Sequence, residues 1–247
     1  MTRPTSRRTA RTLHATVAVL ALTGVVIELV VAIGDGPLAT MYERIWRGLS
    51  YFPILANSLV VIVSAMLAFR PDRDGRVFRV LRLDAVLCIV ATGVAYHLAR
   101  LQMPDVQAST AFSNWLLHTG VPIATVLAWL LVGPRHRPRP PDLGWAFALP
   151  VGWVVYTYAH GAVMGWYPYP FLDPSYLGYP AALAQTALLA VGFFSLGVAL
   201  GLVERARPTH RPAPATPRVR PTPPSSVRAA NVPHSARGTR LGVSPGR

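Results

Sequence analysis

Six long apolar runs, separated by short segments that hold most of the charged residues, constrain this chain more than any other feature. Each run approaches the ~20 residues that a helix needs to cross about 30 Å of hydrocarbon, a length that a soluble core helix does not need. The sequence therefore predicts an all-α fold, a six-helix transmembrane bundle. The spans are expected at residues 13–33, 51–69, 80–101, 113–132, 143–164 and 181–203.

The distribution of arginine predicts how the bundle is oriented. The net charge of +14 comes from arginine alone, because the sequence contains no lysine. Arginines gather in the N-terminus, in two alternate loops and in the tail, whereas the other loops hold only Arg44, Arg47 and, at a span end, Arg100. Since cytoplasmic loops collect arginine, we expect a multi-pass protein of the cell membrane with both termini cytoplasmic. The basic loops and tail are expected to contact anionic lipid, and no nucleic-acid partner is expected.

Composition divides the chain into three parts. Residues 1–12 form a basic cytoplasmic N-terminus, residues 13–203 the membrane domain and residues 204–247 a tail. The tail is rich in Arg, Pro, Ser and Thr and poor in large apolar residues, so we expect it to be disordered. Cys88 is the single cysteine, which excludes an internal disulfide.

Five polar side chains inside the spans suggest a functional site. A side chain that ionises within hydrocarbon costs a few kcal/mol, so each such group is a site hypothesis. From the ~1.5 Å rise per helical residue, all five lie roughly 6 to 9 Å below the outer surface, each on a different span. They are Glu28, Asn57, His97, His118 and His160. We predict a polar pocket open to the outer leaflet; the alternative is five independent interhelical hydrogen bonds.

Asp84 alone lies near the inner side of its span. We expect it to pair with Arg79 or Arg82, or to extend toward the inner surface.

Two further segments are expected to border the pocket. In the second span, Pro53 fits the first helical turn and Ser50 just ahead can cap the helix. The segment 165–174 interleaves three prolines with aromatic residues, which suits both an aromatic belt and a stiff cover over a cavity. The expected lining residues are Glu28, Tyr51, Pro53, His97, His160, Trp166, Tyr167, Tyr169, Phe171 and Asp173.

The string Gly-Trp-Tyr-Pro-Tyr-Pro-Phe-Leu-Asp-Pro at 165–174, together with Leu-His-Thr-Gly-Val-Pro at 117–122, resembles the bacterial Pr-six-Pr membrane proteins. These are relatives of the androgen-induced multipass hydrolases, which cleave fatty acid esters of hydroxy fatty acids. The likeness covers the six-helix region and not the tail. It implies a membrane-embedded threonine nucleophile with a histidine base. His118 matches the family histidine, whereas Pro53 stands where the relatives have threonine.

Three functions follow from these residues. In a lipid-ester hydrolase, His118 is the general base, Asn57 polarises the carbonyl of an acyl ester from the outer leaflet, and Ser50 is a candidate hydroxyl. A zinc enzyme is the alternative that uses a metal, although we expect no cofactor; its ligands would be His97, His118, His160 and Glu28. The third function is a non-catalytic lipid-binding or structural membrane protein. The sequence has no repeated halves of the kind that many transporters have, so a transporter is not favoured.

Overall fold

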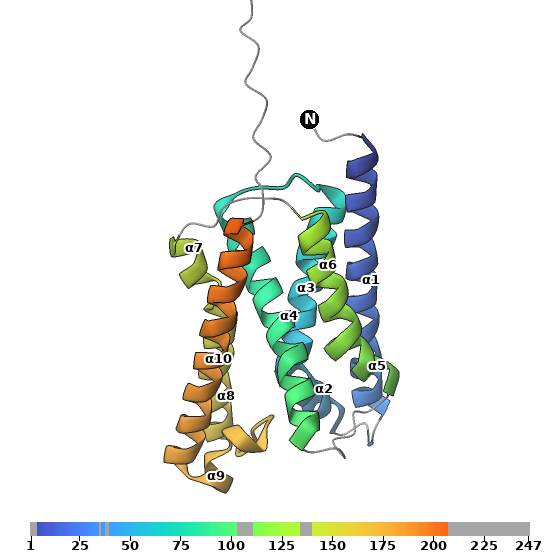
Figure 1. Ribbon diagram of the computed structural model, residues 1–247. Helices are drawn as coiled ribbons and strands as arrows, with labels where there is room; N and C mark the ends of the chain where they lie inside the picture. Colours follow the sequence, from blue (N-terminus) through green and yellow to red (C-terminus); the bar gives the residue numbers. More distant parts are fainter. Residues whose placement is uncertain (1–3, 35, 38–39, 103–110, 134–139, 207–247) are drawn as a thin grey trace, which may run out of the picture. The chain divides into compact units, whose positions relative to one another are not determined.

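The computed structural model describes residues 4–34, 36–37, 40–102, 111–133 and 140–206, and over these residues it consists of helices joined by turns and loops, without strands. Long helices alternate in direction along the chain (Figure 1). They are α1 (Pro4–Gly34), α3 (Phe52–Phe69), α4 (Arg76–Gln102), the continuous α5 (Ala111–Trp115), η2 (Leu116–Gly120) and α6 (Val121–Leu131), then α8 (Ala148–Met164) and α10 (Tyr179–Ala206). This confirms the all-α fold predicted from the sequence. The first three residues of the predicted tail, Glu204, Arg205 and Ala206, are not disordered but form the end of α10, and the rest of the tail lies outside the described residues.

Four of these helices are long and apolar enough to cross a membrane. They are Arg7–Gly34, Phe52–Phe69, Ala111–Leu131 and Tyr179–Ala206. α4 and α8 occupy the two remaining predicted positions with different bounds. α4 begins at Arg76 instead of residue 80, and α8 begins at Ala148 instead of residue 143.

Short helices connect the long ones, namely α2 (Met41–Ser50), α7 (Pro140–Trp145), η3 (Pro170–Leu172) and α9 (Pro174–Leu177). α2 lies in a segment that the sequence analysis treated as a loop. Arg44 on α2 donates hydrogen bonds to the carbonyl oxygens of Ala32 and Ile33, both at 2.9 Å. Because the last carbonyls of a helix have no partner within it, Arg44 caps α1 and fixes α2 against it.

The core lies where α1, α3, α4 and α6 meet. Its most buried side chains are small or branched, such as Ala21, Ala56 and Val121, which are fully buried. Small residues let helices approach closely in a membrane bundle. Gly93 on α4 is one such position, because an added Cβ would lie 3.1 Å from the backbone oxygen of His118.

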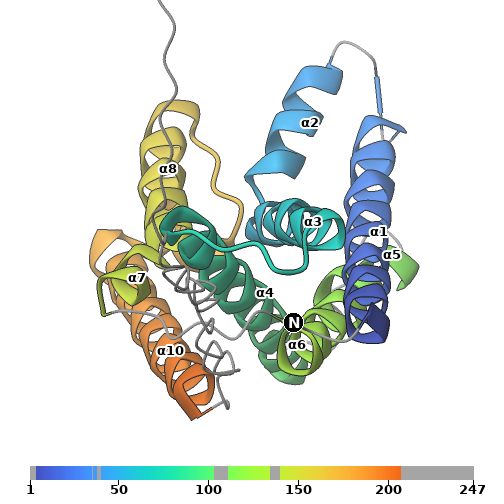
Figure 2. The same cartoon turned by 90° about the horizontal axis from the view of Figure 1, so that it is seen from above.

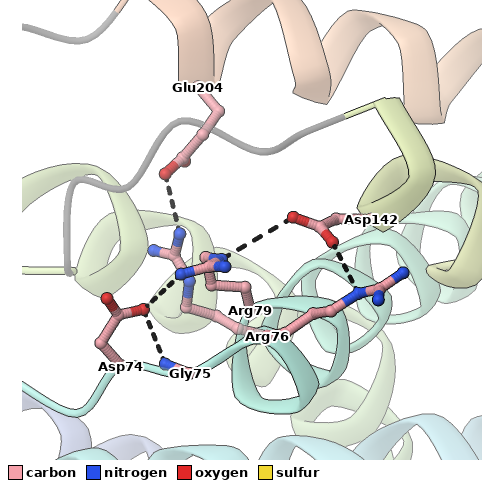
Figure 3. Close-up of polar contacts among 7 residues, drawn as sticks. Asp74, Gly75, Arg76, Arg79, Asp142 and Glu204 are labelled. Atoms are coloured by element: carbon pink, nitrogen blue, oxygen red, sulfur yellow. Dashed lines mark hydrogen bonds and ion pairs between the residues drawn. The ribbon is translucent and has the colours of Figure 1, made fainter.

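Most of the described arginines lie at one end of the bundle. The start of α1, the loop between α3 and α4, α7 and the end of α10 all lie at this end, which we call the arginine-rich end (Figure 1). Here Arg82 and Glu204 form a buried ion pair of 2.8 Å with side chains 4% and 1% exposed. Buried Asp142 lies 3.6 Å from Arg76 and 3.7 Å from Arg79 (Figure 3). These contacts join α4 to α7 and α10.

The expected pairing of Asp84 with Arg79 or Arg82 is wrong. The Asp84 carboxylate accepts instead from Cys88 Sγ at 3.0 Å and from the backbone N–H of Leu149 at 3.4 Å. Leu149 lies in the first turn of α8, where unpaired N–H groups and the helix dipole favour a carboxylate.

Candidate functional site

Two polar clusters lie at the other end of the helices, which we call the arginine-poor end. The histidine cluster comprises Tyr96, His97, Asn114, His118 and Thr119, from α4, α5 and η2. The aromatic cluster comprises Trp46, Ser50, Tyr156, His160 and Trp166, from α2, α8 and the loop after α8. Viewed along the helices, α5 and α8 lie on opposite sides of α3 and α4 (Figure 2). Of the predicted pocket residues, His97 and His118 therefore lie in one cluster and His160 in the other.

In the histidine cluster, the exposed His97 lies beside a hydroxyl. Its Nε2 is 3.1 Å from Thr119 Oγ1, within hydrogen-bond distance. Thr119 belongs to η2, one turn of π-helix inside an otherwise α-helical segment. Such turns are rare and are frequent at functional sites. A hydroxyl next to an imidazole is the arrangement that activates a weak nucleophile.

His118 is held next to this pair. Its Nδ1 is 3.0 Å from the carbonyl oxygen of Asn114, and its ring stacks on Tyr96 with centroids 4.3 Å apart. Because a carbonyl only accepts, Nδ1 must carry the proton. In the neutral ring Nε2 then keeps its lone pair and can act as a base.

Glu28 and Tyr96 connect α1 and α4 to the helix that carries His118. Glu28 on α1 accepts a 2.5 Å hydrogen bond from buried Ser113 on α5. The Tyr96 hydroxyl accepts from Asn114 Nδ2 and, at 3.1 Å, from Arg100. These bonds connect α1 and α4 to the helix that carries His118.

Asn57 is fully buried and is occupied by the backbone. Its Nδ2 donates to the carbonyl oxygens of Pro53 at 2.8 Å and Leu117 at 3.3 Å. Both amide hydrogens are thus engaged, and the bond to Leu117 ties α3 to η2 immediately before His118. An ester carbonyl would have to displace one of these bonds to be polarised by Asn57.

The aromatic cluster is built around His160. Trp46 Nε1 donates to His160 Nε2 at 2.9 Å, and the His160 ring stacks on Tyr156 with centroids 5.3 Å apart. Trp166 contacts the same imidazole edge-on, with centroids 6.2 Å apart. Since the indole N–H donates to Nε2, this nitrogen is an acceptor in the neutral ring.

Ser50 ends α2 and does not cap α3, whose N-cap is Tyr51. The Ser50 hydroxyl donates to the carbonyl oxygen of Trp46 at 2.8 Å and lies 2.7 Å from the Tyr156 hydroxyl. Because its one hydrogen is used, Tyr156 is the donor in the second bond. Ser50 therefore acts as a buried link between α2 and α8. Pro53 lies in the first turn of α3, as predicted.

An apolar groove of about 220 Å³ runs along α3 and α8 and ends at the aromatic cluster. Tyr156 belongs to both. The groove is lined by Leu55, Ala148, Leu149, Gly152, Trp153 and Tyr156. Trp153, one of the lining residues, donates from Nε1 to the carbonyl oxygen of Ser50 at 2.8 Å.

The segment 165–174 packs as a set of aromatic rings at the arginine-poor end. Tyr51 contacts Trp166 and Tyr169 edge-on, with centroids 6.0 and 5.7 Å apart. Phe171 stacks on Tyr169 at 5.2 Å, and Tyr167 meets Tyr158 at 6.1 Å.

Asp173 has a local structural role in this segment. It is the N-cap of α9 and accepts from the backbone N–H and the hydroxyl of Ser175, at 2.8 and 2.5 Å. Such a cap fixes where the helix begins.

Tyr169 gives a prediction for alkaline pH. Burial, and to a smaller degree the nearby Tyr51, raise the pKa of Tyr169 above its ordinary value of 10.0. Because the pKa of Tyr169 is raised in the folded state, its contribution to the free energy of unfolding is fully present below pH 10 and is lost as the pH rises above it. We expect the unfolding midpoint to drop between pH 10 and 11, and Tyr169→Phe to flatten this drop in thermal unfolding followed by circular dichroism. An equally steep drop in Tyr169→Phe would contradict it.

Among the described residues, no three His, Cys, Asp or Glu side chains lie close enough to share a metal ion. His160 lies in the aromatic cluster, apart from His97 and His118 in the histidine cluster. The zinc alternative therefore has no assembled ligand set in this part of the chain.

Five residues of the two clusters were not predicted from the sequence, namely Thr119, Tyr96, Asn114, Trp46 and Tyr156. Thr119 stood next to His118 in the quoted motif, but its partner His97 lies 22 residues away and only the fold brings it near. Trp46 lay in the segment taken as a loop, where its aromatic character was the available signal. No protein family model, curated protein or solved structure matches this chain.

Proposed function

We propose that this chain is a six-span protein of the cell membrane that binds a lipid acyl chain in the groove between α3 and α8. The arginine-rich end faces the cytoplasm, because arginine is retained on that side, and the groove runs along α8 from Leu149, beside Asp84, toward the arginine-poor end as far as Tyr156. The observation that carries the proposal is the groove itself, whose lining is apolar except at Tyr156, where the hydroxyl donates to Ser50. Acyl chains with a polar head match this arrangement.

The membrane contacts of the rest of the chain fit this role. The exposed arginines of the arginine-rich end, such as Arg70 and Arg73, would contact anionic headgroups of the inner leaflet. Arg7, Arg11 and Arg205 would do the same from the two ends of the described chain.

The test of lipid binding uses Gly152, which lines the groove and whose Cβ would meet no atom within 4 Å. Gly152→Leu is expected to fill the groove without a clash and to weaken binding of a fluorescent acyl ester about tenfold. Displacing two methylenes costs about 1.6 kcal/mol, which corresponds to that factor. Binding would be measured by fluorescence anisotropy of the ester with protein in nanodiscs.

Gly192 on α10 is the matched control, since it is also a helical glycine with open space at its Cβ. Gly192→Leu is expected to leave binding unchanged. Equal affinity of Gly152→Leu and the parent protein would refute the groove as the lipid site.

A second candidate function, hydrolysis of a lipid ester, is favoured by the distance between His97 and Thr119. The Thr119 hydroxyl proton passes to His97 Nε2 while Oγ1 attacks the ester carbonyl carbon. The alcohol leaves with the proton from His97, and water then releases the acid from the acyl-threonine by the same route. This pair supplies the nucleophile that Pro53 lacks, with His118 beside it as a second base. Loss of activity in Thr119→Val tests this assignment.

A further inference from the structure

The face of α2 at the arginine-poor end presents two large aromatic rings. Tyr42 and Trp46 are 76% and 41% exposed, and their rings lie 6.3 Å apart at an interplanar angle of 23°. The hydrogen bond from Trp46 to His160 fixes the indole plane. The electron-rich faces of such rings attract cations, and most strongly the face of tryptophan.

This surface already holds one cation and one anion. The Arg47 guanidinium lies 5.2 Å from the Trp166 ring centroid and 2.5 Å from the Glu43 carboxylate. Both charged side chains are about half exposed, at 45% and 54%. A guanidinium matches the geometry of a phosphate, and a carboxylate favours an ammonium. The pair Arg47 and Glu43 thus carries the two charges that complement a phosphate joined to an ammonium.

The charged and aromatic surface is continuous with the groove. Trp46 contacts Tyr156 edge-on, with centroids 6.4 Å apart, and Tyr156 lines the groove end. A single molecule with an acyl chain and a zwitterionic head would reach both.

We propose that α2 forms a headgroup site for a phospholipid that carries an ammonium group. Its phosphate contacts Arg47, its ammonium lies against Trp46 and Tyr42 near Glu43, and one acyl chain enters the groove. This inference rests on the proposed lipid binding and adds the class of lipid. A headgroup without an ammonium brings no cation to the faces of Trp46 and Tyr42 or to Glu43, so it is disfavoured at this surface.

The experiment compares three lysophospholipids that share one acyl chain and differ in the headgroup, namely phosphocholine, phosphoethanolamine and phosphoglycerol. Their binding to the full-length protein in nonionic detergent would be measured by native mass spectrometry. We expect the two ammonium lipids to bind about fivefold more tightly than the phosphoglycerol lipid, the effect of one exposed cation–π contact. In Trp46→Leu the three affinities are expected to become equal.

Two further variants keep the test decisive. Tyr42→Leu removes an exposed ring without touching the bond between Trp46 and His160, and it is expected to reduce the preference as well. Tyr176→Leu on α9 removes an aromatic ring that is 77% exposed outside this surface, and it is expected to keep the preference.

A preference that survives in both Trp46→Leu and Tyr42→Leu, or tighter binding of the phosphoglycerol lipid by the parent protein, would overturn the headgroup site. Unchanged binding of all three lipids by Gly152→Leu would instead overturn the groove. The two failures are therefore distinguishable.

Discussion

Replacing Glu204 with glutamine is expected to destabilise the protein by about 3 to 5 kcal/mol. Glu204 is the buried carboxylate that pairs with Arg82 at 2.8 Å, and a neutral amide in its place removes the charge attraction between these two buried side chains. The pair joins the end of α10 to the start of α4, so the loss is expected to appear as separation of α10 at lower denaturant. Unfolding in mixed micelles with increasing dodecyl sulfate, followed by tryptophan fluorescence, measures this change.

The exposed pair of Arg7 and Asp72, 2.6 Å apart, provides the control. Asp72→Asn is expected to cost less than about 1 kcal/mol, because water screens exposed charges. Replacing both Arg82 and Glu204 by leucine is expected to restore much of the lost stability, since both buried charges are then removed. A Glu204→Gln protein as stable as Asp72→Asn would show that Arg82 finds other compensation.

Thr119→Val is expected to lower hydrolysis of a fluorogenic acyl ester at least about 100-fold, because valine has the shape of threonine without the hydroxyl. His97→Gln is expected to cause a similar loss and to remove the pH dependence that belongs to the imidazole. Both variants leave the other side chains of the histidine cluster unchanged. Initial rates with protein in nanodiscs would be compared across pH 5 to 9.

Thr119→Ser is the matched variant, since it keeps a hydroxyl at the same position and is expected to keep most of the activity. Full activity of Thr119→Val would exclude Thr119 as the nucleophile. Activity lost only in His118→Ala would move the base from His97 to His118, the residue that the sequence analysis preferred.

The helical course of the chain could be predicted from hydropathy because each long helix is governed by one physical requirement. An apolar run of about 20 residues must bury itself and satisfy its own backbone. The observed ends of a helix differ from the predicted ones where polar contacts outside the apolar run extend the helix. Arg76 and Arg79 extend α4 beyond its apolar part because Asp142 lies near both. α2 was not predicted because it is amphipathic and lies outside the apolar runs.

The candidate site was only partly predictable. Depth along a helix follows from residue number, so the placement of His97, His118 and His160 at the arginine-poor end was accessible from the sequence. The direction of each side chain around the helix was not, because it depends on packing. Asn57 forms a hydrogen bond with the backbone of Leu117, and His160 forms one with Trp46. Neither partner was among the expected polar residues.

The π-helical turn at Leu116–Gly120 has a consequence for the helix that contains it. Its wider ring of atoms accommodates one residue more per turn than an α-helix, so the faces before and after it are rotated relative to each other. Ser113 and Asn114 can therefore meet Glu28 and Tyr96 while Val121 and Ala128 remain in the core. The part of the helix before the turn thus contacts α1 and α4 at the arginine-poor end, while the part after it stays packed against the other long helices.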